Sequence, residues 1–247
     1  CFRSVSLHLP EGTLVNPVEP APVNSRTATL KRIAGSIVGA LKGALPGHIP
    51  ADSAGELLVL SLGGKHSDGK PYVVGEFNAG GSGGGPRKDG VDVIETDGSN
   101  CMNMPVEALE LEAPARVHRM SLRTDSGGVG EFRGGLGCVR EIEFLTDDIA
   151  LTHRGERHRH AARGSQGGGD GAKAFSKIIR RDGSEEVVNS KLFTIVHAGE
   201  RLILETAGGG GYGKSNNRDR QAIRDDVSNG KVSQQCANAE YGLGDVN

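Results

Sequence analysis

The segment from Thr124 to Gly137 holds six glycines, one aspartate and one arginine in fourteen positions. Glycine loses more conformational freedom on folding than any other residue, so this density predicts a specific backbone role. Successive N–H groups near Gly127 and Gly128 could form a concave anion site, and Arg133 could bind a phosphate through two hydrogen bonds. Asp125 is then a candidate catalytic residue on the same loop as the arginine.

The same loop has a structural interpretation that the sequence leaves open. Aspartate and serine side chains commonly accept hydrogen bonds from the backbone of their own turn. Asp125 and Ser126 could therefore stabilise the turn, with Arg133 paired to Asp125 instead of to a ligand. We keep Ser126 among the candidate phosphate-binding residues, together with the two glycines that follow it.

A second glycine block occupies residues 206–213. Gly209 and Gly210 in this block could also cradle a phosphate. The block lacks the Lys-Ser/Thr ending of a P-loop, and no helix is expected directly after it, so a nucleotide site of that type is not predicted. Close backbone packing against another chain is the alternative interpretation, because glycine permits near approach.

The most polar stretch beside an apolar helix runs from Glu95 to Asn103. Glu95 or Asp97 could act as a general base, a role that carboxylates can take in hydrolysis. Asn100 and Asn103 could orient an amide substrate through their side-chain amides. Asn103 could equally cap a helix that begins at Pro105, because asparagine is favoured at that position.

Residues 153–160 mix histidines with charged residues and so look like a metal site. His153, Glu156 and His158 would have to converge on one side of the chain, and a strand followed by a turn does not require that. The spacing favours a charged, solvated turn, and no metal ligand is predicted in this chain. Glu156 and Arg157 are kept as candidate substrate-binding or phosphate-binding residues.

The composition argues against several classes of protein. The 247 residues carry a formal net charge of −2, which gives no electrostatic reason to bind nucleic acid. No apolar run approaches the length of a membrane-spanning helix, so no membrane partner is expected. The four cysteines are widely spaced without a C-x-x-C pair. This pattern favours reduced thiols in a cytoplasmic protein over a disulfide framework.

The first half of the chain predicts one long helix and a hairpin. Apolar residues recur at helical spacing over residues 24–45. Residues 57–62 and 72–77 are strand-like and separated by a polar turn, so they predict a β-hairpin. A glycine loop follows over residues 80–90, and residues 105–111 predict a short helix.

The second half of the chain predicts mostly short strands. Seven segments between residues 116 and 205 alternate apolar and polar residues, which is typical of a β-barrel or sandwich. Residues 219–228 and 233–241 predict a polar helical tail. The expected fold class is α+β. Its expected parts are an α+β segment (residues 1–112), a β-rich domain (113–213) and the helical tail (214–247).

Several motifs follow one another in a fixed order along most of the chain. They are Cys1-Phe2-Arg3, Pro10–Pro17, Lys88–Asp92, Pro105–Glu107, Arg123–Gly137, Glu156-Arg157, Ser190-Lys191 and Glu205–Gly213. Together they resemble the hydantoinase B/oxoprolinase family, and ordered landmarks are far stronger evidence than one glycine cluster. The resemblance covers the C-terminal portion of a considerably longer family subunit. Residues 1–112 are therefore expected to complete a domain begun in the missing N-terminal half.

The resemblance implies a subunit of an ATP-dependent hydrolase of cyclic amides such as hydantoins or 5-oxoproline. A partner subunit similar to hydantoinase A would bind ATP with Mg²⁺ and phosphorylate the ring amide. This chain would then help water attack the activated carbon. Either the sequence is a fragment of the subunit, or the subunit is split and a further chain carries the N-terminal half; a divalent metal could bind in that half. Two alternatives stay open: a subunit of an ATP-dependent ketone carboxylase, and an assembly subunit without catalytic residues of its own.

Overall fold

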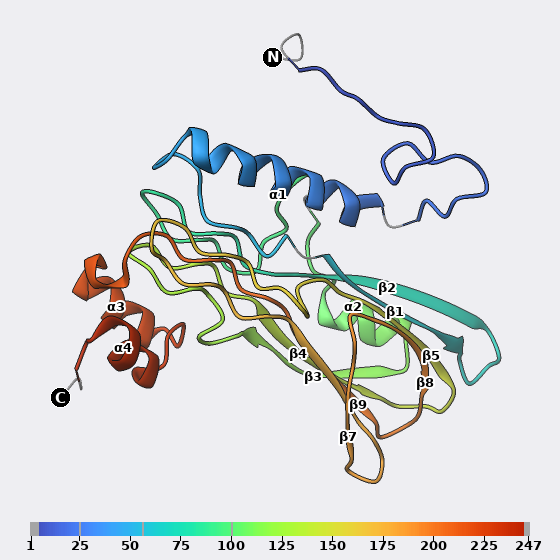
Figure 1. The fold of residues 1–247 in the computed structure, drawn as a ribbon. Helices are drawn as coiled ribbons and strands as arrows, with labels where there is room; N and C mark the ends of the chain where they lie inside the picture. Colours follow the sequence, from blue (N-terminus) through green and yellow to red (C-terminus); the bar gives the residue numbers. More distant parts are fainter. Residues whose placement is uncertain (1–4, 25, 56, 100, 245–247) are drawn as a thin grey trace.

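The computed structural model describes residues 5–24, 26–55, 57–99 and 101–244. Two antiparallel sheets lie against each other at one end of this part of the chain, and extended glycine-rich segments continue from them (Figure 1). A long helix, α1, lies above these segments, and two short helices near the C-terminus lie beyond them (Figure 1). The helices are α1 (Arg26–Ala44), α2 (Val106–Glu112), α3 (Arg220–Ser228) and α4 (Gln234–Tyr241), with a 3₁₀ turn η2 (Ser215–Asn217).

The described strands form two open sheets, so the structure is a sandwich and the predicted alternative of a closed barrel is wrong. The first sheet has the order β2-β1-β5-β8 and the second has the order β3-β4-β9-β6-β7, with neighbouring strands antiparallel. The strands are β1 (Leu57–Lys65), β2 (Pro71–Ala79), β3 (Ala115–Leu122), β4 (Cys138–Phe144), β5 (Ile149–Arg154), β6 (Phe175–Ile179), β7 (Glu185–Val187), β8 (Lys191–Val196) and β9 (Arg201–Glu205).

The predicted long helix, hairpin, seven later strands and helical tail all occur, with ends shifted by a few residues. Each was predicted from a pattern that lies within a single element, either the helical period or the strand period of two. The division at residues 112 and 113 stays a prediction. Strand β1 on one side of it is paired with β5 on the other.

Alternate residues of the strands fill the space between the two sheets. Leu58, Leu60 and Leu62 of β1 are at most 1% exposed, and Ile142 and Leu204 of the second sheet are fully buried. Burial of each such side chain contributes roughly 2 kcal/mol relative to exposure. This apolar layer is the main core of the described residues.

Two polar links cross that core. In the first sheet Leu60 is flanked by Glu76 of β2 and His153 of β5. Across from them, Arg140 of β4 forms an ion pair with Glu76, and Ser176 of β6 lies 3.0 Å from Nε2 of His153. Buried polar groups tolerate few alternative arrangements, so these links help to fix how the sheets face each other.

Burial dominates the titration of both acid–base groups in this layer. It raises the pKa of Glu76, against the lowering effect of the Arg140 charge. It lowers the pKa of His153 to about 4, with a further contribution from nearby His158. The imidazole of His153 is therefore neutral at pH 7.

The glycine-rich segments form a bundle in which residues 206–213 are central. The N–H groups of every third residue point to the same side: two pairs return to the same neighbouring segment (residues 169–172 and 132–135), and the third pair bonds two different segments, at Asp52 and Ser165. A repeat of three is that of a polyproline II helix and differs from the repeat of two in a β-strand. The donor–acceptor pairs are Gly208–Ala172, Gly211–Gly169, Gly209–Gly135, Tyr212–Phe132, Gly210–Asp52 and Gly213–Ser165.

The central segment needs glycine because its neighbours approach the backbone itself. A Cβ atom added at Gly208 would lie 1.8 Å from the carbonyl oxygen of Ser126, and one at Gly209 would lie 1.9 Å from that of Ser82. No side chain fits at those distances. The alternative interpretation, packing against another chain, is therefore corrected, because the close backbone packing of this block occurs within the chain.

Candidate functional site

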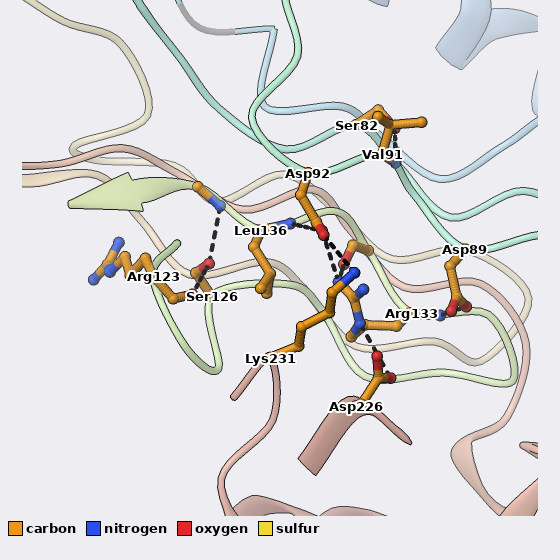
Figure 2. A network of polar contacts seen from close by, with 12 residues as sticks. Ser82, Asp89, Val91, Asp92, Arg123, Ser126, Arg133, Leu136, Asp226 and Lys231 are labelled. Atoms are coloured by element: carbon orange, nitrogen blue, oxygen red, sulfur yellow. Dashed lines mark hydrogen bonds and ion pairs between the residues drawn. The ribbon is translucent and has the colours of Figure 1, made fainter. Parts of the chain in front are cut away.

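Arg133, a predicted catalytic residue, is buried in a network of charges (Figure 2). Its Nη1 lies 3.1 Å from Oδ1 of Asp92, and its Nε lies 3.3 Å from Oδ2 of Asp226. The same Nη1 donates to the carbonyl oxygen of Gly134 at 2.6 Å. Two carboxylates and a carbonyl thus occupy the guanidinium, which does not pair with Asp125 as the structural interpretation predicted.

The network continues through Arg218, which joins Asp89 by two bonds of 2.6 and 2.7 Å and Asp226 by one of 2.6 Å. Lys231 adds an ion pair of 2.9 Å with Asp92. Burial alone would raise the pKa of Asp89, but the hydrogen bonds and charge of Arg218 outweigh it and lower the pKa. These contacts fasten the C-terminal helices to the glycine bundle.

The other predicted residues of this loop are also engaged by the protein. Asp125 has a φ of 62° and accepts a hydrogen bond of 2.8 Å from the N–H of Ser233, next to α4. The hydroxyl of Ser126 donates to the carbonyl of Arg123 at 2.6 Å and accepts from the N–H of Gly137 at 3.0 Å. Asp125 and Ser126 therefore stabilise local structure here.

Three glycines of the predicted anion site use their N–H groups within the protein. The N–H groups of Gly128, Gly209 and Gly210 donate to carbonyl oxygens at 2.8, 2.9 and 2.9 Å. A Cβ atom at Gly127 would lie 2.0 Å from the carbonyl oxygen of Gly134, so protein also fills the space beside this residue. Groups that already bond within the bundle are not available to cradle a phosphate.

A cavity of about 310 Å³ under α1 brings other predicted residues together. Asp97 and Arg157, which are distant in sequence, both line it. So do Lys31 and Arg32 of α1, which sequence reasoning did not single out. The remaining lining residues are Gly35, Ser36, Val38, Pro50, Ala51, Asp52 and Ser53.

Lys31 and Glu95 form a buried ion pair beside this cavity. The Lys31 side chain is fully buried, and its Nζ lies 3.4 Å from Oε2 of Glu95 and donates to the carbonyl of Thr96. Glu95 also accepts a hydrogen bond from the hydroxyl of Ser99. These contacts hold the turn that carries Asp97. Glu95 itself is not among the lining residues.

Two arginines that line the cavity bind backbone carbonyls. Arg157 donates from Nε to Ala54 at 2.7 Å and from Nη2 to Ser53 at 2.9 Å. Arg32 donates to the carbonyls of Ala54 and Gly55. Among the described residues Arg32 forms no ion pair, and its Nε is buried without a hydrogen-bond partner.

The charges around the cavity favour an anionic ligand. Lys31 is paired with Glu95 at 3.4 Å, and Asp52 is paired with Lys42 at 2.5 Å. The other lining charges are the cations Arg32 and Arg157 and the anion Asp97. Oδ2 of Asp97 accepts a hydrogen bond of 3.0 Å from Thr96. Asp97 has a φ of 63°, a turn conformation that presents its carboxylate at the cavity. The cavity thus combines cations with a half-buried carboxylate.

The remaining predicted residues lie elsewhere. Asn100 falls outside the described residues. Asn103 is half-buried and does not line the cavity, and it does not cap α2, whose N-cap is Pro105 without a side-chain hydrogen bond. Glu156 pairs with Lys191 at 3.0 Å beside a separate hollow between α1 and the first sheet.

The histidine-rich stretch is engaged within the protein. His153 contacts Ser176 in the core, and His158 hydrogen-bonds the carbonyl of Glu156 at 2.8 Å. Within the described residues, no three His, Cys, Asp or Glu side chains gather closely enough to hold a metal ion. No described helix is both long and apolar enough to cross a membrane. Among the described residues Cys101, Cys138 and Cys236 form no disulfide bond, and a cytoplasmic location stays a prediction.

Comparison with known families decides the classification. The profile described as hydantoinase B/oxoprolinase matches residues 1–215. The chain belongs to this family. It is 30% identical over 244 residues to a putative D-/L-hydantoinase chain of Pseudomonas sp. strain NS671, covering 98% of this chain and 41% of that one. It thus spans less than half the length of this relative.

Solved structures agree with the family fold. The ATP-dependent caprolactamase from Pseudomonas jessenii matches with a TM-score of 0.83 and 31% identity, over 100% of this chain and 44% of that chain. A nucleotide-free acetone carboxylase matches with a TM-score of 0.69 over 78% of this chain and 30% of that chain. At 20% identity the second likeness shows the fold alone.

Sequence reasoning missed Lys31 and Arg32 for a specific reason. Both interrupt the apolar pattern of the predicted helix, and that interruption was the available signal. A helix pattern does not state which face is covered. The expectation that apolar residues face the core would place these two cations in solvent. The structure places them inward.

Proposed function

We propose that this chain is part of an ATP-dependent hydrolase that opens cyclic amides. The observation that carries the proposal is the match of the whole chain, at 31% identity, to a structure named as an ATP-dependent caprolactamase. The relative named as a hydantoinase points to the same kind of substrate. Caprolactam and hydantoin both contain a ring amide, so the proposed substrate class is a cyclic amide.

The chemistry requires activation because an amide carbonyl is resonance-stabilised. In the proposed reaction a hydantoinase A-like partner subunit uses ATP with Mg²⁺ to phosphorylate the ring amide oxygen. Water then adds to the carbon, and collapse of the tetrahedral intermediate breaks the ring C–N bond, so that the ring nitrogen leaves as a protonated amine and an acyl phosphate remains. A second water hydrolyses this acyl phosphate to the carboxylate and free phosphate. The N–H groups of Gly128, Gly209 and Gly210 are already bonded within the bundle. This engagement supports ATP binding on the partner.

We assign the activated ring to the cavity under α1. Arg32 and Arg157 would bind its phosphate and the developing oxyanion, since cations already held in place stabilise such charge effectively. Asp97 would take the proton from the attacking water. Glu95 would act through its ion pair with Lys31, holding the turn that carries Asp97. The proposal moves the predicted site away from Asp125 and Arg133, which bond to other parts of the chain.

The decisive experiment uses the native complex that contains this chain. ADP release and ring opening are measured together with 5-oxoproline, a hydantoin or caprolactam, without bicarbonate. Coupled release of ADP and ring-opened product supports the proposal. Turnover that requires a ketone and bicarbonate would replace it with the carboxylase alternative. Ring opening by this chain without its ATP-binding partner would contradict the proposed division of labour.

Two matched variants in the same complex locate the chemistry. Asp97→Asn should lower the rate of ring opening by about 10²–10⁴-fold, the usual contribution of a positioned general base. Asp125→Asn keeps an oxygen acceptor for Ser233 and should leave turnover nearly unchanged. If both variants turn over normally, neither aspartate is the base, and that result would favour the assembly alternative.

The position of a metal stays a separate proposal. The resemblance implies that a divalent metal could bind in the part of the family subunit that has no counterpart here. The described residues offer no group of three ligands for it. Metal analysis of the native complex and of this chain expressed separately would test that assignment. Metal retained by the separate chain would contradict it.

A further inference from the structure

Helix α1 lies with its charged side toward the rest of the chain. Lys31, the buried residue of the helix, pairs with Glu95 at 3.4 Å. Arg32 donates to the carbonyls of Ala54 and Gly55. Near the other end of the helix, Lys42 pairs with Asp52 at 2.5 Å. Three contacts along its length therefore fix which face of α1 points inward.

The opposite face of α1 is apolar and exposed. Leu30, Ile33, Ile37 and Leu41 are spaced at helical intervals and are 47, 39, 58 and 40% exposed. A stripe of this kind normally faces a core. Because the charged face is already anchored, the helix cannot turn the stripe inward without breaking those contacts. The described residues leave this stripe largely uncovered.

The exposed stripe borders a hollow formed with the N-terminal arm, residues 5–24. Leu14 and Val15 of the arm, together with Ile33 and Ile37 of α1, line a space of about 400 Å³. Leu14 is 80% exposed and Val15 is 42% exposed. Figure 1 shows the arm extending beyond the N-terminal end of α1. The arm and helix together form an apolar surface with a recess, the form that receives inserted side chains.

We propose that this surface, the outer face of α1 with the arm, binds the part of the family subunit that has no counterpart in this chain. The caprolactamase chain matches all of this chain over only 44% of its own length. The remaining 56% (100 − 44) must pack against the matched part to make one subunit. Permanent contacts of that kind are more apolar than contacts between transient partners, as this surface is.

The inference rests on membership of the family and not on the proposed reaction, so the two can fail independently. It assigns the surface to one occupant. The ATP-binding partner and a second copy of this chain are the competing occupants, and identification of the contacting polypeptide separates them.

The first test measures protection of the surface in the native assembly. Ile37→Cys and, as a control for reagent access, Val187→Cys on β7 are labelled with a maleimide and followed by peptide mass spectrometry. Val187 is 64% exposed and lies on β7 in the second sheet, whereas Ile37 lies on helix α1. The expected labelling of Ile37→Cys is slower by about tenfold or more in the native than in the denatured assembly, because packed side chains exclude reagent. Equal rates in the two states would overturn the proposal.

The second test identifies the occupant. A maleimide cross-linker with a photoreactive end is attached to Ile37→Cys, and the cross-linked peptide is sequenced. A peptide from the unmatched part of the family subunit supports the proposal. A peptide from the ATP-binding subunit or from another copy of this chain overturns it.

A third test asks whether the stripe is needed for association. Where the unmatched part is a separate polypeptide, Ile33→Asp/Ile37→Asp should reduce its co-purification by about tenfold or more, since buried carboxylates are strongly disfavoured. Val187→Asp should leave co-purification unchanged. Full retention by the double variant would contradict the proposal, and circular dichroism would verify that both variants remain folded.

Discussion

Two clusters of charge lie on different sides of the glycine bundle and serve different purposes. Around Arg133 and Arg218 the cations meet carboxylates of Asp89, Asp92 and Asp226 at 2.6–3.3 Å. Under α1, Arg32 and Arg157 donate to backbone carbonyls and line open space. Paired charges hold segments together, whereas charges that face a cavity can act on a ligand. Residue type alone did not distinguish the two clusters.

The difference also explains why the glycine motif misled functional interpretation. Residues 206–213 attract attention because glycine loops often bind phosphates. Here the same residues are required because the extended segments cannot otherwise pack so closely around one another. The bundle supports both charge clusters but contributes no free N–H group at Gly128, Gly209 or Gly210.

Gly209→Ala should have the largest effect on stability. Its Cβ would lie 1.9 Å from the carbonyl oxygen of Ser82, and backbone cannot move aside as a side chain can. We expect a loss of at least about 4 kcal/mol, or failure to fold, measured by urea unfolding. Gly39→Ala in α1 is the control, because its Cβ meets nothing within 4 Å. That change should stabilise the helix by up to about 1 kcal/mol. Equal effects would contradict the packing role of the bundle.

Arg133→Met and Arg32→Met test the contrast between the two clusters directly. The first leaves half-buried Asp92 and buried Asp226 without this partner, and should cost about 3–5 kcal/mol of unfolding free energy. The second should cost about 1 kcal/mol or less, since Arg32 forms no ion pair among the described residues. The rate of turnover per folded complex should show the reverse order, with a larger loss for Arg32→Met than for Arg133→Met. A large stability loss for Arg32→Met would make the second cluster structural as well.

His153, in the core between the two sheets, belongs to neither charge cluster, because its imidazole is neutral in the folded protein at pH 7. The pKa of His153 is lowered to about 4, below its ordinary value of 6.5. The unfolded chain therefore binds the extra proton first as pH falls. The contribution of neutral His153 to the free energy of unfolding is therefore fully present above pH 6.5. It is lost as the pH falls from about 6.5 to about 4. Its upper limit is roughly 3 kcal/mol.

Urea unfolding at pH 7 and pH 5 would measure this loss. His153→Leu/Ser176→Ala removes both partners of the hydrogen bond and should flatten the pH dependence relative to the natural sequence. His48→Gln changes an exposed histidine and should leave the pH dependence of the unfolding free energy as it is in the natural sequence. Glu76 also titrates in this layer, so the difference between the variants, not the absolute slope, reports His153. An unchanged slope in the double variant would refute the assignment.

Ser233→Ala should have the smallest effect. Its hydroxyl accepts a hydrogen bond of 3.0 Å from the N–H of Cys236 at the beginning of α4. Loss of this cap should cost about 1 kcal/mol by thermal unfolding without changing turnover. The loss of unfolding free energy in Ser233→Ala measures what one local hydrogen bond near α4 contributes. We expect it to be smaller than the loss in Arg133→Met. A cost above that of Arg133→Met would reverse the proposed ranking.

The sequence by itself determined the secondary elements. The helix over Arg26–Ala44, the hairpin and the seven later strands each follow from spacing within one short segment. The family also followed from motifs in a fixed order. Of the proposed site, Asp97 and Arg157 were among the candidate residues, because each stands in a polar stretch whose composition is visible locally.

Only the tertiary structure decided which charges are paired and which face of α1 is covered. Arg133 meets Asp226 across 93 positions, and Arg218 meets Asp89 across 129. Lys31 is buried beside Glu95, 64 positions later (95 − 31), while Ile37 of the same helix is exposed. Spacing along one element cannot encode such pairings, because they depend on how distant segments approach one another in the folded chain.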